Sequence, residues 1–428
     1  MAKKYLLKGG RYIDPSTTSD EVIDILIVDG IIDSMKPSIA PPPDCEVIDL
    51  RGKIIAPGFV DMHVHLREPG FEHKETIETG TLSAAHGGFT AVCCMPNTNP
   101  AIDDESIVRF VHSQGKLVNK GIVDVYPIGA VTKGRAGKEL SSIAELVQAG
   151  AVGLSDDGAP VFDAEIMRRV LEYAGMFDVP VIQHCEEPSL VRGGVMNEGF
   201  VATELGLPGI PSVAEEIMIA RDILLTEYTN SRYHVAHMST AGSVKLVREA
   251  KQKGIAITCE VTPHHFTLTD DAVRSFDTNT KMNPPLRTRD DVEAVKQGIR
   301  EGSVDVIASD HAPHSLDEKE VDYLQAPFGI VGLETAIGLA ITELVASNII
   351  TFSQLVEKFS TNPRTIIKRI IDIHEGNSAN FTFIDPEIRW KVEVSRFKSK
   401  SKNSPFDGKA LKGRAIGIFN RGELLLVG

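Results

Sequence analysis

The stretch DMHVHLREPG, residues 61 to 70, contains the side chains best suited to chemistry. His63 and His65 are separated by one residue, and Arg67 follows two positions later. Side chains at alternate positions of a strand point to the same side, so both imidazoles would face one site. Imidazole is a common ligand of Zn²⁺, and a guanidinium binds carboxylates through two parallel hydrogen bonds. The stretch therefore predicts a metal site with an anion-binding group beside it.

Other histidines and aspartates stand where further short apolar runs end. Asp156 and Asp157 close the fourth such run, His184 the fifth, His237 the sixth and Asp310 the eighth. The carboxyl ends of parallel strands converge on one mouth of a barrel, where catalytic groups collect. Imidazoles and carboxylates gathered there form a ligand set suited to zinc.

Eight apolar runs, each followed by a segment of helical spacing, must position these residues. The runs are GFVDMHV, FTAVCCM, VDVYPIGAV, AVGLS, VPVIQH, YHVAHM, AITCEV and VDVIAS. Among the helix candidates between them, SVAEEIMIARDILLTEY is expected to open with a capping box of Ser212 and Glu215. Eight alternations over roughly 250 residues predict an α/β fold, a (β/α)8 TIM barrel, although an open doubly wound sheet has the same periodicity.

The two ends of the chain have a different pattern, with β-rich pieces between turn residues. We expect residues 1–56 and 373–428 to pair into one small β-domain beside a catalytic barrel at 57–372. The basic run SRFKSKSKNSPFDG, residues 395 to 408, is predicted to be a solvated loop.

Composition excludes several classes of function. The formal charge of −14 argues against nucleic-acid binding. The chain has no uninterrupted run of about 18 apolar residues, so we expect no membrane span. The five cysteines lack a CxxC pair and fit reduced thiols. The amino-terminal stretch lacks the apolar core of a signal peptide, so we expect a cytoplasmic protein.

The remaining histidines fit the site less well. His234 is out of step with His237 and should point away from the mouth, whereas His264 and His265 are candidates for a supporting role. No role is expected for His73, His86, His112 and His374.

Many ordered motifs of the chain resemble one known family. They are GFVDMHVHLREPG, MPNTNP, SDDG, HCEE, HVAHMST, EVTPHH, KMNPPLR and DHAPH. By these motifs the chain resembles the cyclic amidohydrolases of the amidohydrolase superfamily, in particular the class I bacterial dihydroorotases. The resemblance implies a metal-dependent (β/α)8 barrel with a small β-sandwich formed by both termini. It also implies the reversible cyclisation of N-carbamoyl-L-aspartate to L-dihydroorotate and water, the third step of de novo pyrimidine (UMP) biosynthesis.

The resemblance implies ligands for one or two Zn²⁺ ions per chain. The implied metal ligands are His63, His65, Asp157, His184, His237 and Asp310. Many relatives bridge the two metals with a carboxylated lysine. Asp157 would take the place of that lysine here, with Asp156 as the alternative. Asp310 would also be the catalytic residue that shuttles the proton.

The resemblance further implies a set of substrate contacts. They are His65, Arg67, Asn97, Asn283, His314, Phe328 and Gly329. Arg67 would bind the ring carboxylate, with Asn97 and His314 as further contacts. The alternative for Arg67 is a structural ion pair with Glu68 or Glu75.

Rival functions remain open beside dihydroorotase. A hydantoinase or dihydropyrimidinase would normally keep the bridging lysine and lack Arg67, and an allantoinase shares only part of the motif set. A non-catalytic dihydroorotase-like partner of aspartate transcarbamoylase would have lost metal ligands. The chain is expected to bind a small-molecule substrate, and either a homodimer or a complex with aspartate transcarbamoylase is compatible with its sequence.

Overall fold

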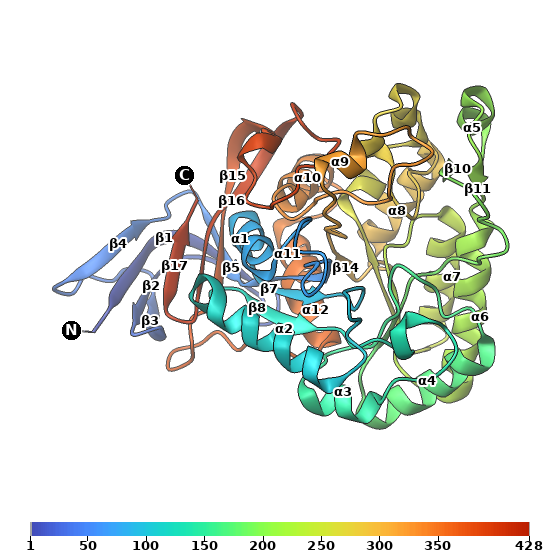
Figure 1. Cartoon of the computed structure of the whole chain (residues 1–428). Helices are drawn as coiled ribbons and strands as arrows, with labels where there is room; N and C mark the ends of the chain where they lie inside the picture. The colour runs from blue at the N-terminus through green and yellow to red at the C-terminus, as the bar shows by residue number, and fades with distance from the viewer. Residues whose placement is uncertain (1, 428) are drawn as a thin grey trace.

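Strands from both ends of the chain form one sheet in the computed structural model, which describes residues 2–427 (Figure 1). The amino-terminal strands are β1 (Lys4–Asp14), β2 (Ser19–Val28), β3 (Ile31–Lys36), β4 (Cys45–Asp49) and β5 (Ile54–Pro57). The carboxyl-terminal strands are β15 (Phe381–Lys391), β16 (Ala410–Asn420) and β17 (Glu423–Leu426). Their order is β17-β16-β15-β5-β1-β2-β3, with β4 paired to β1.

Antiparallel pairing of β15 with β5 joins the two termini. The small β-domain is therefore present, but the expected sandwich takes the form of one continuous eight-stranded sheet. Side chains of strands that are not adjacent in this sheet share one core: Tyr5 of β1 packs edge-on against Phe419 of β16, with 5.5 Å between ring centroids. Alternating Ile25, Ile27, Phe381 and Phe383 complete this core, as period-two patterning requires.

Parallel strands form the second part of the molecule. β6 (Phe59–Val64), β7 (Phe89–Cys94) and β8 (Asp124–Pro127) make a three-stranded sheet, and β9 (Val181–Gln183), β12 (Tyr233–Val235), β13 (Ile257–Val261) and β14 (Val306–Ile307) make a four-stranded one. β6 and β7 are buried along their whole length, as expected of parallel strands covered on both faces.

The fourth apolar run, AVGLS, does not form a continuous strand. Instead, single bridges join Leu154 to Gly129 on one side and to Val181 on the other. A further bridge joins Val64, at the end of β6, to His311. These bridges connect the two parallel sheets at both of their edges.

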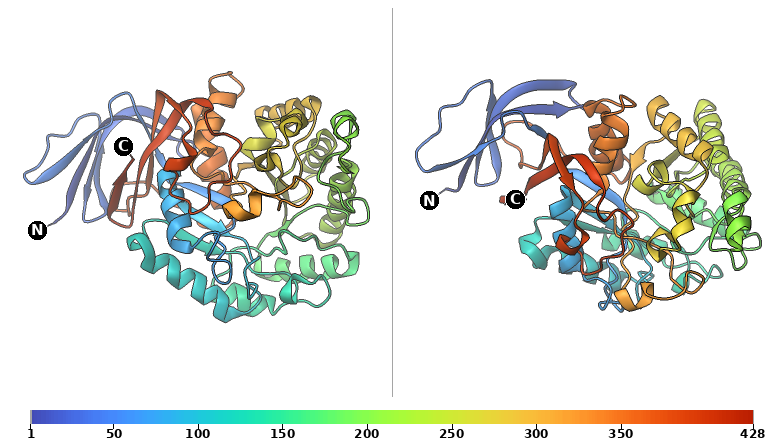
Figure 2. Two further views of the ribbon diagram at one scale, coloured as in Figure 1. Left: turned by 45° about the horizontal axis from the view of Figure 1, so that its top comes forward. Right: turned by 90° about the horizontal axis from the view of Figure 1, so that it is seen from above.

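Helices lie around the outside of the parallel strands (Figure 2). Those between successive apolar runs are α1 (Ile77–Gly87), α2 (Glu105–Leu117), α3 (Ile143–Ala149), α4 (Ala164–Phe177), α6 (Val213–Thr229), α7 (Ala241–Gln252) and α8 (Arg289–Glu301). Shorter elements are α5 (Phe200–Leu205), α9 (Leu316–Lys319), α10 (Ala336–Ala340), α11 (Phe352–Val356), α12 (Asn362–Ile366) and the paired strands β10 (Met196–Asn197) and β11 (Gly209–Ile210). Within residues 2–427, no helix is both long and apolar enough to span a membrane.

The predicted capping box of α6 is wrong. Ser212 is itself in a helical conformation and its side chain makes no capping hydrogen bond. Glu215 is buried and accepts the backbone N–H of Ser239 at 2.9 Å, because it faces the end of the neighbouring strand rather than its own helix.

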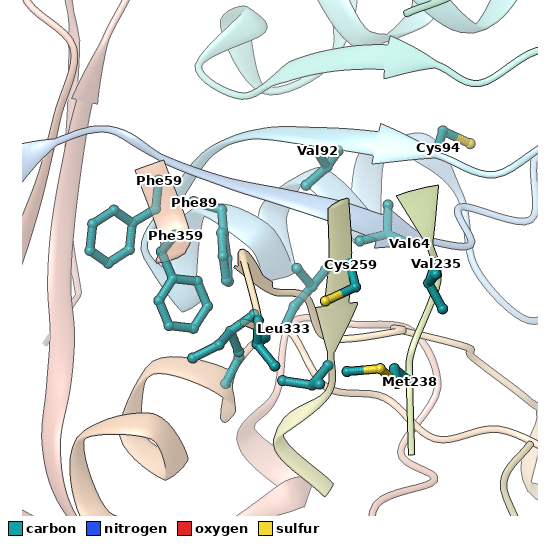
Figure 3. Packing of buried hydrophobic residues seen from close by; sticks show 14 of the residues in the cluster. Phe59, Val64, Phe89, Val92, Cys94, Val235, Met238, Cys259, Leu333 and Phe359 are labelled. Carbon is teal, nitrogen blue, oxygen red and sulfur yellow. The ribbon is translucent and has the colours of Figure 1, made fainter. Parts of the chain in front are cut away.

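The main core lies between the parallel strands and the helices (Figure 3). The ring of Phe359 stacks on Phe59 at 5.4 Å and lies 5.9 Å from Phe89. All five cysteines are free thiols. Burial raises the pKa of both Cys94 and Cys259 to about 12, so these thiols act as apolar packing groups.

The basic segment 395–408 is not the solvated loop that its composition predicts. Lys398, Lys400 and Lys402 are exposed, but the alternate residues Ser399, Ser401 and Asn403 are buried. The segment runs along the parallel-strand part of the molecule with its small polar side chains inward. Burial is possible because those side chains find hydrogen-bond partners there.

Candidate metal centre and active site

The structure brings the six predicted metal ligands together at the carboxyl ends of the parallel strands, and all six are buried. His63 and His65 lie at the end of β6. Nε2 of His63 is 3.3 Å from Asp157 Oδ2 and 3.5 Å from Asp310 Oδ1. Nε2 of His65 is 3.0 Å from Asp310 Oδ1 and 3.6 Å from Asp157 Oδ2.

A second group of side chains lies on the other side of Asp157. Oδ1 of Asp157 is 3.4 Å from His237 Nε2 and 3.8 Å from His184 Nδ1. Asp157 thus presents one oxygen to each histidine pair. The neighbouring Asp156 faces elsewhere and accepts hydrogen bonds from the backbone and hydroxyl of Thr132.

These residues fit a divalent metal by an independent criterion. His63 Nε2 and Asp157 Oδ1 are buried and have no hydrogen-bond partner among residues 2–427. Such atoms are strongly destabilising unless another group binds them. Nitrogen and carboxylate oxygen donors are the ligands that zinc accepts in catalytic sites.

Backbone strain accompanies the site. Arg67, His237 and Asp310 have φ values of 63°, 30° and 48°, in the left-handed region that such residues rarely occupy. Strain of this kind persists where the surrounding structure over-determines the conformation, and it is common at functional sites.

A buried carboxylate that the sequence analysis missed supports His63. Oε1 of Glu260, in β13, lies 2.5 Å from His63 Nδ1, and its Oε2 lies 3.3 Å from His234 Nε2. His234 therefore points away from the ligand cluster, as expected. Burial opposes ionisation of Glu260, but the charges of His63 and His234 outweigh it and lower the pKa of Glu260 to about 2. Glu260 fixes the ring orientation of His63.

Asp61 also supports the site and was missed. It accepts the backbone N–H groups of His63 and Ser309, each at 3.1 Å, and so ties β6 to the segment that carries Asp310. Asp61 and Glu260 share one sequence signal: each is a carboxylate inside an otherwise apolar run.

His264 and His265 are both buried next to the site. His265 bonds Thr262 Oγ1 at 2.7 Å and the carbonyl of Pro284 at 3.0 Å. Burial lowers the pKa of His265 to about 3, so it is a neutral structural group.

A cavity of about 220 Å³ opens beside the metal ligands. All of the predicted substrate contacts line it: His65, Arg67, Asn97, Asn283, His314, Phe328 and Gly329. Asp157, His184, His237 and Asp310 line it too, whereas His63 lies beneath the surface.

The guanidinium of Arg67 is buried in the wall of this cavity. Its Nε donates to the carbonyl of Pro313 at 3.1 Å, and one terminal nitrogen lies 3.4 Å from His314 Nε2. No carboxylate among residues 2–427 lies within 4.0 Å of it. Glu75 instead contacts His311, and Glu68 accepts the N–H of Ile77, so neither forms the alternative ion pair.

Another missed residue, Glu186, contacts two residues that line this cavity. Its Oε2 is 3.0 Å from His184 Nε2 and accepts a hydrogen bond from Asn283. The acidic pair after His184 in HCEE was the available sequence signal.

Solved structures share this fold along the whole chain. An L-hydantoinase (dihydropyrimidinase) from Arthrobacter aurescens aligns with a TM-score of 0.87 and 24% identity, covering 100% of this chain and 96% of that one. The dihydropyrimidinase from Brevibacillus agri NCHU1002 aligns with a TM-score of 0.84 and 21% identity, covering 99% and 95%. The chain therefore shares its fold with these two structures.

Comparison with sequence relatives identifies the family of the chain. A family model described as dihydro-orotase-like matches residues 52–243. The dihydroorotase of Pelotomaculum thermopropionicum is 53% identical over 96% of this chain and 95% of its own length, and that of Acetivibrio thermocellus is 52% identical over 98% of each. The chain belongs to the dihydroorotase family.

Proposed function

We propose that this protein is a dihydroorotase, an enzyme that reversibly cyclises N-carbamoyl-L-aspartate to L-dihydroorotate and water. Identities of about 50% to curated dihydroorotases over nearly the full chain support the activity. The choice of substrate rests on Arg67, a buried guanidinium that lines the cavity and has no carboxylate within 4.0 Å among the described residues 2–427. Dihydroorotate supplies that carboxylate.

His63, His65, Asp157, His184, His237 and Asp310 are proposed to hold one or two Zn²⁺ ions. The unpartnered buried atoms of His63 and Asp157 and the two ligand groups that share Asp157 support this assignment. When bound, the metal supplies a Lewis acid that polarises the reacting carbonyl and lowers the pKa of water.

Asp310 is proposed as the proton shuttle. In the hydrolytic direction it accepts a proton from the attacking water and passes it to the departing ring nitrogen. In the biosynthetic direction it takes a proton from the carbamoyl nitrogen and returns it to the leaving hydroxide. One carboxylate serves both steps because each requires a base and then its conjugate acid at the same place.

The cavity wall is proposed to orient the ring. Arg67, Asn97 and His314 would bind the ring carboxylate, Asn283 and the Phe328–Gly329 backbone would meet the pyrimidine edge, and His65 would contact the reacting end. Oδ1 of Asn97 accepts a hydrogen bond from His65 Nδ1 at 2.9 Å, which couples the metal and substrate sides.

We also propose how the chain is divided into domains, on the basis of the isolated backbone bridges between the two parallel sheets. The Leu154 and Val64–His311 bridges support a closed (β/α)8 barrel at residues 57–372, with the small β-domain formed by 1–56 and 373–428. A biosynthetic enzyme with five free thiols is expected in the reducing cytoplasm.

Ring opening of L-dihydroorotate, dihydrouracil, hydantoin and allantoin by the zinc-loaded protein tests the function. We expect dihydroorotate to be preferred by about a hundredfold or more in kcat/KM, because a site built for a charged group rejects analogues without it. A chelator should abolish the activity and Zn²⁺ should restore it. A preference for hydantoin or allantoin would assign the protein to that hydrolase instead.

A further inference from the structure

Asn403 connects the carboxyl-terminal segment to the wall of the active-site cavity. Its Oδ1 accepts the backbone N–H of His314 at 3.1 Å, and its Nδ2 donates to the carbonyls of Ala312 and Gly329, both at 3.1 Å. The Asn403 side chain is buried. One amide thus joins the loop at residues 312–314 to the loop at Gly329.

Both loops carry residues assigned above to substrate binding. His314 Nε2 lies 2.9 Å from the carbonyl of Phe328, so the loops also contact each other. The carbonyl of Pro313, between the two positions that Asn403 holds, accepts the hydrogen bond from Arg67 Nε. The position of the guanidinium therefore depends on backbone that Asn403 fixes.

The segment itself is anchored at a second place. The backbone N–H of Lys400 donates to Glu75 Oε1 at 3.0 Å, and the Ser399 hydroxyl donates to the same carboxylate. Oε2 of Glu75 lies 3.3 Å from His311 Nε2, directly after Asp310 in the chain. The contacts to Glu75 thus fix the segment that carries Asn403.

We propose that Asn403 is a positioning residue for the carboxylate-binding wall of the active site. It does not line the cavity beside the metal ligands and acts through His314, Gly329 and Arg67. Without its amide, one N–H and two carbonyls lose their partners, the two loops separate, and the contacts to the ring carboxylate are misplaced. This inference rests on the proposed dihydroorotase function.

Asn403→Ala tests the inference, with Asn420→Ala as its matched control. Asn420 is equally buried and also donates to two carbonyls, those of Thr90 and Ile122, at the opposite ends of the strands. We expect Asn403→Ala to raise KM for dihydroorotate about tenfold while kcat changes less than about threefold. Both variants should lower Tm by similar amounts, but Asn420→Ala should leave KM unchanged.

Asn403→Asp is the second variant, which keeps the acceptor for His314 but replaces the donors to Ala312 and Gly329. It should raise KM in the same way, and it keeps the test valid if the alanine variant fails to fold. Unchanged KM in the folded Asn403 variants, or an equal rise in Asn420→Ala, would overturn the inference alone. A wild-type protein inactive on dihydroorotate would overturn the proposed function and this inference with it.

Discussion

Nδ1 of His63 lies 2.5 Å from Oε1 of Glu260, and both side chains are fully buried. The contact fixes which ring nitrogen of His63 faces Asp157 and Asp310. It also places a negative charge behind the ring, which raises the basicity of a metal-binding imidazole.

Glu260→Gln should weaken zinc binding by about ten- to a hundredfold, because it keeps the shape but removes the charge behind His63. Competition with a chelating indicator dye measures the affinity. Glu334→Gln is the control, since Glu334 bonds Ser83 and the carboxyl-terminal segment and contacts none of the proposed ligands. Wild-type affinity in Glu260→Gln would show that Glu260 has only a packing role.

Asp157→Asn and Asp156→Asn form a matched pair of neighbouring changes. Asp157 lies between the two histidine pairs, so its substitution should remove at least half of the bound zinc and lower kcat by about a hundredfold or more. Asp156→Asn should retain zinc, because Asp156 bonds Thr132. Metal analysis of both purified proteins decides the assignment, and equal zinc loss in the two variants would contradict it.

Asp310→Asn should lower kcat by about a hundredfold or more, the usual scale for loss of a general acid–base group. Asp305→Asn is a control on the same segment, since Asp305 pairs with Lys251 instead of facing the cavity. Zinc content must be measured in parallel, because Asp310 is also a proposed ligand. An Asp310→Asn protein with full zinc and normal turnover would remove Asp310 from the mechanism.

Arg67→Met should lower kcat/KM for dihydroorotate about ten- to a hundredfold, since hydrogen bonds to charged groups are worth roughly 1.5–3 kcal/mol each. Zinc content should not change. Dihydrouracil has the same ring without the carboxylate, so it should be a poor substrate of the wild type and should lose little further. If both substrates lose activity equally, Arg67 supports the fold or the metal site and does not bind the carboxylate.

The sequence indicated the chemistry of the site because that chemistry follows local rules. Alternation along a strand places His63 and His65 on one side, and the carboxyl ends of parallel strands bring His184 and His237 to the same mouth. These rules need no knowledge of the loops. The same reasoning failed for the capping box of α6, because a buried contact to Ser239 outweighs the local pairing of Glu215 with its own helix.

By itself, the sequence determined the alternation of strands and helices, the set of potential ligands and the anion-binding role expected of Arg67. Only the tertiary structure decided which aspartate of the pair faces the histidines, since the turn after Leu154 directs Asp156 to Thr132 and Asp157 inward. It also decided that Asn403 reaches His314 across 89 positions of the chain. Such contacts depend on how distant segments pack, and neither periodicity nor residue type encodes that packing locally.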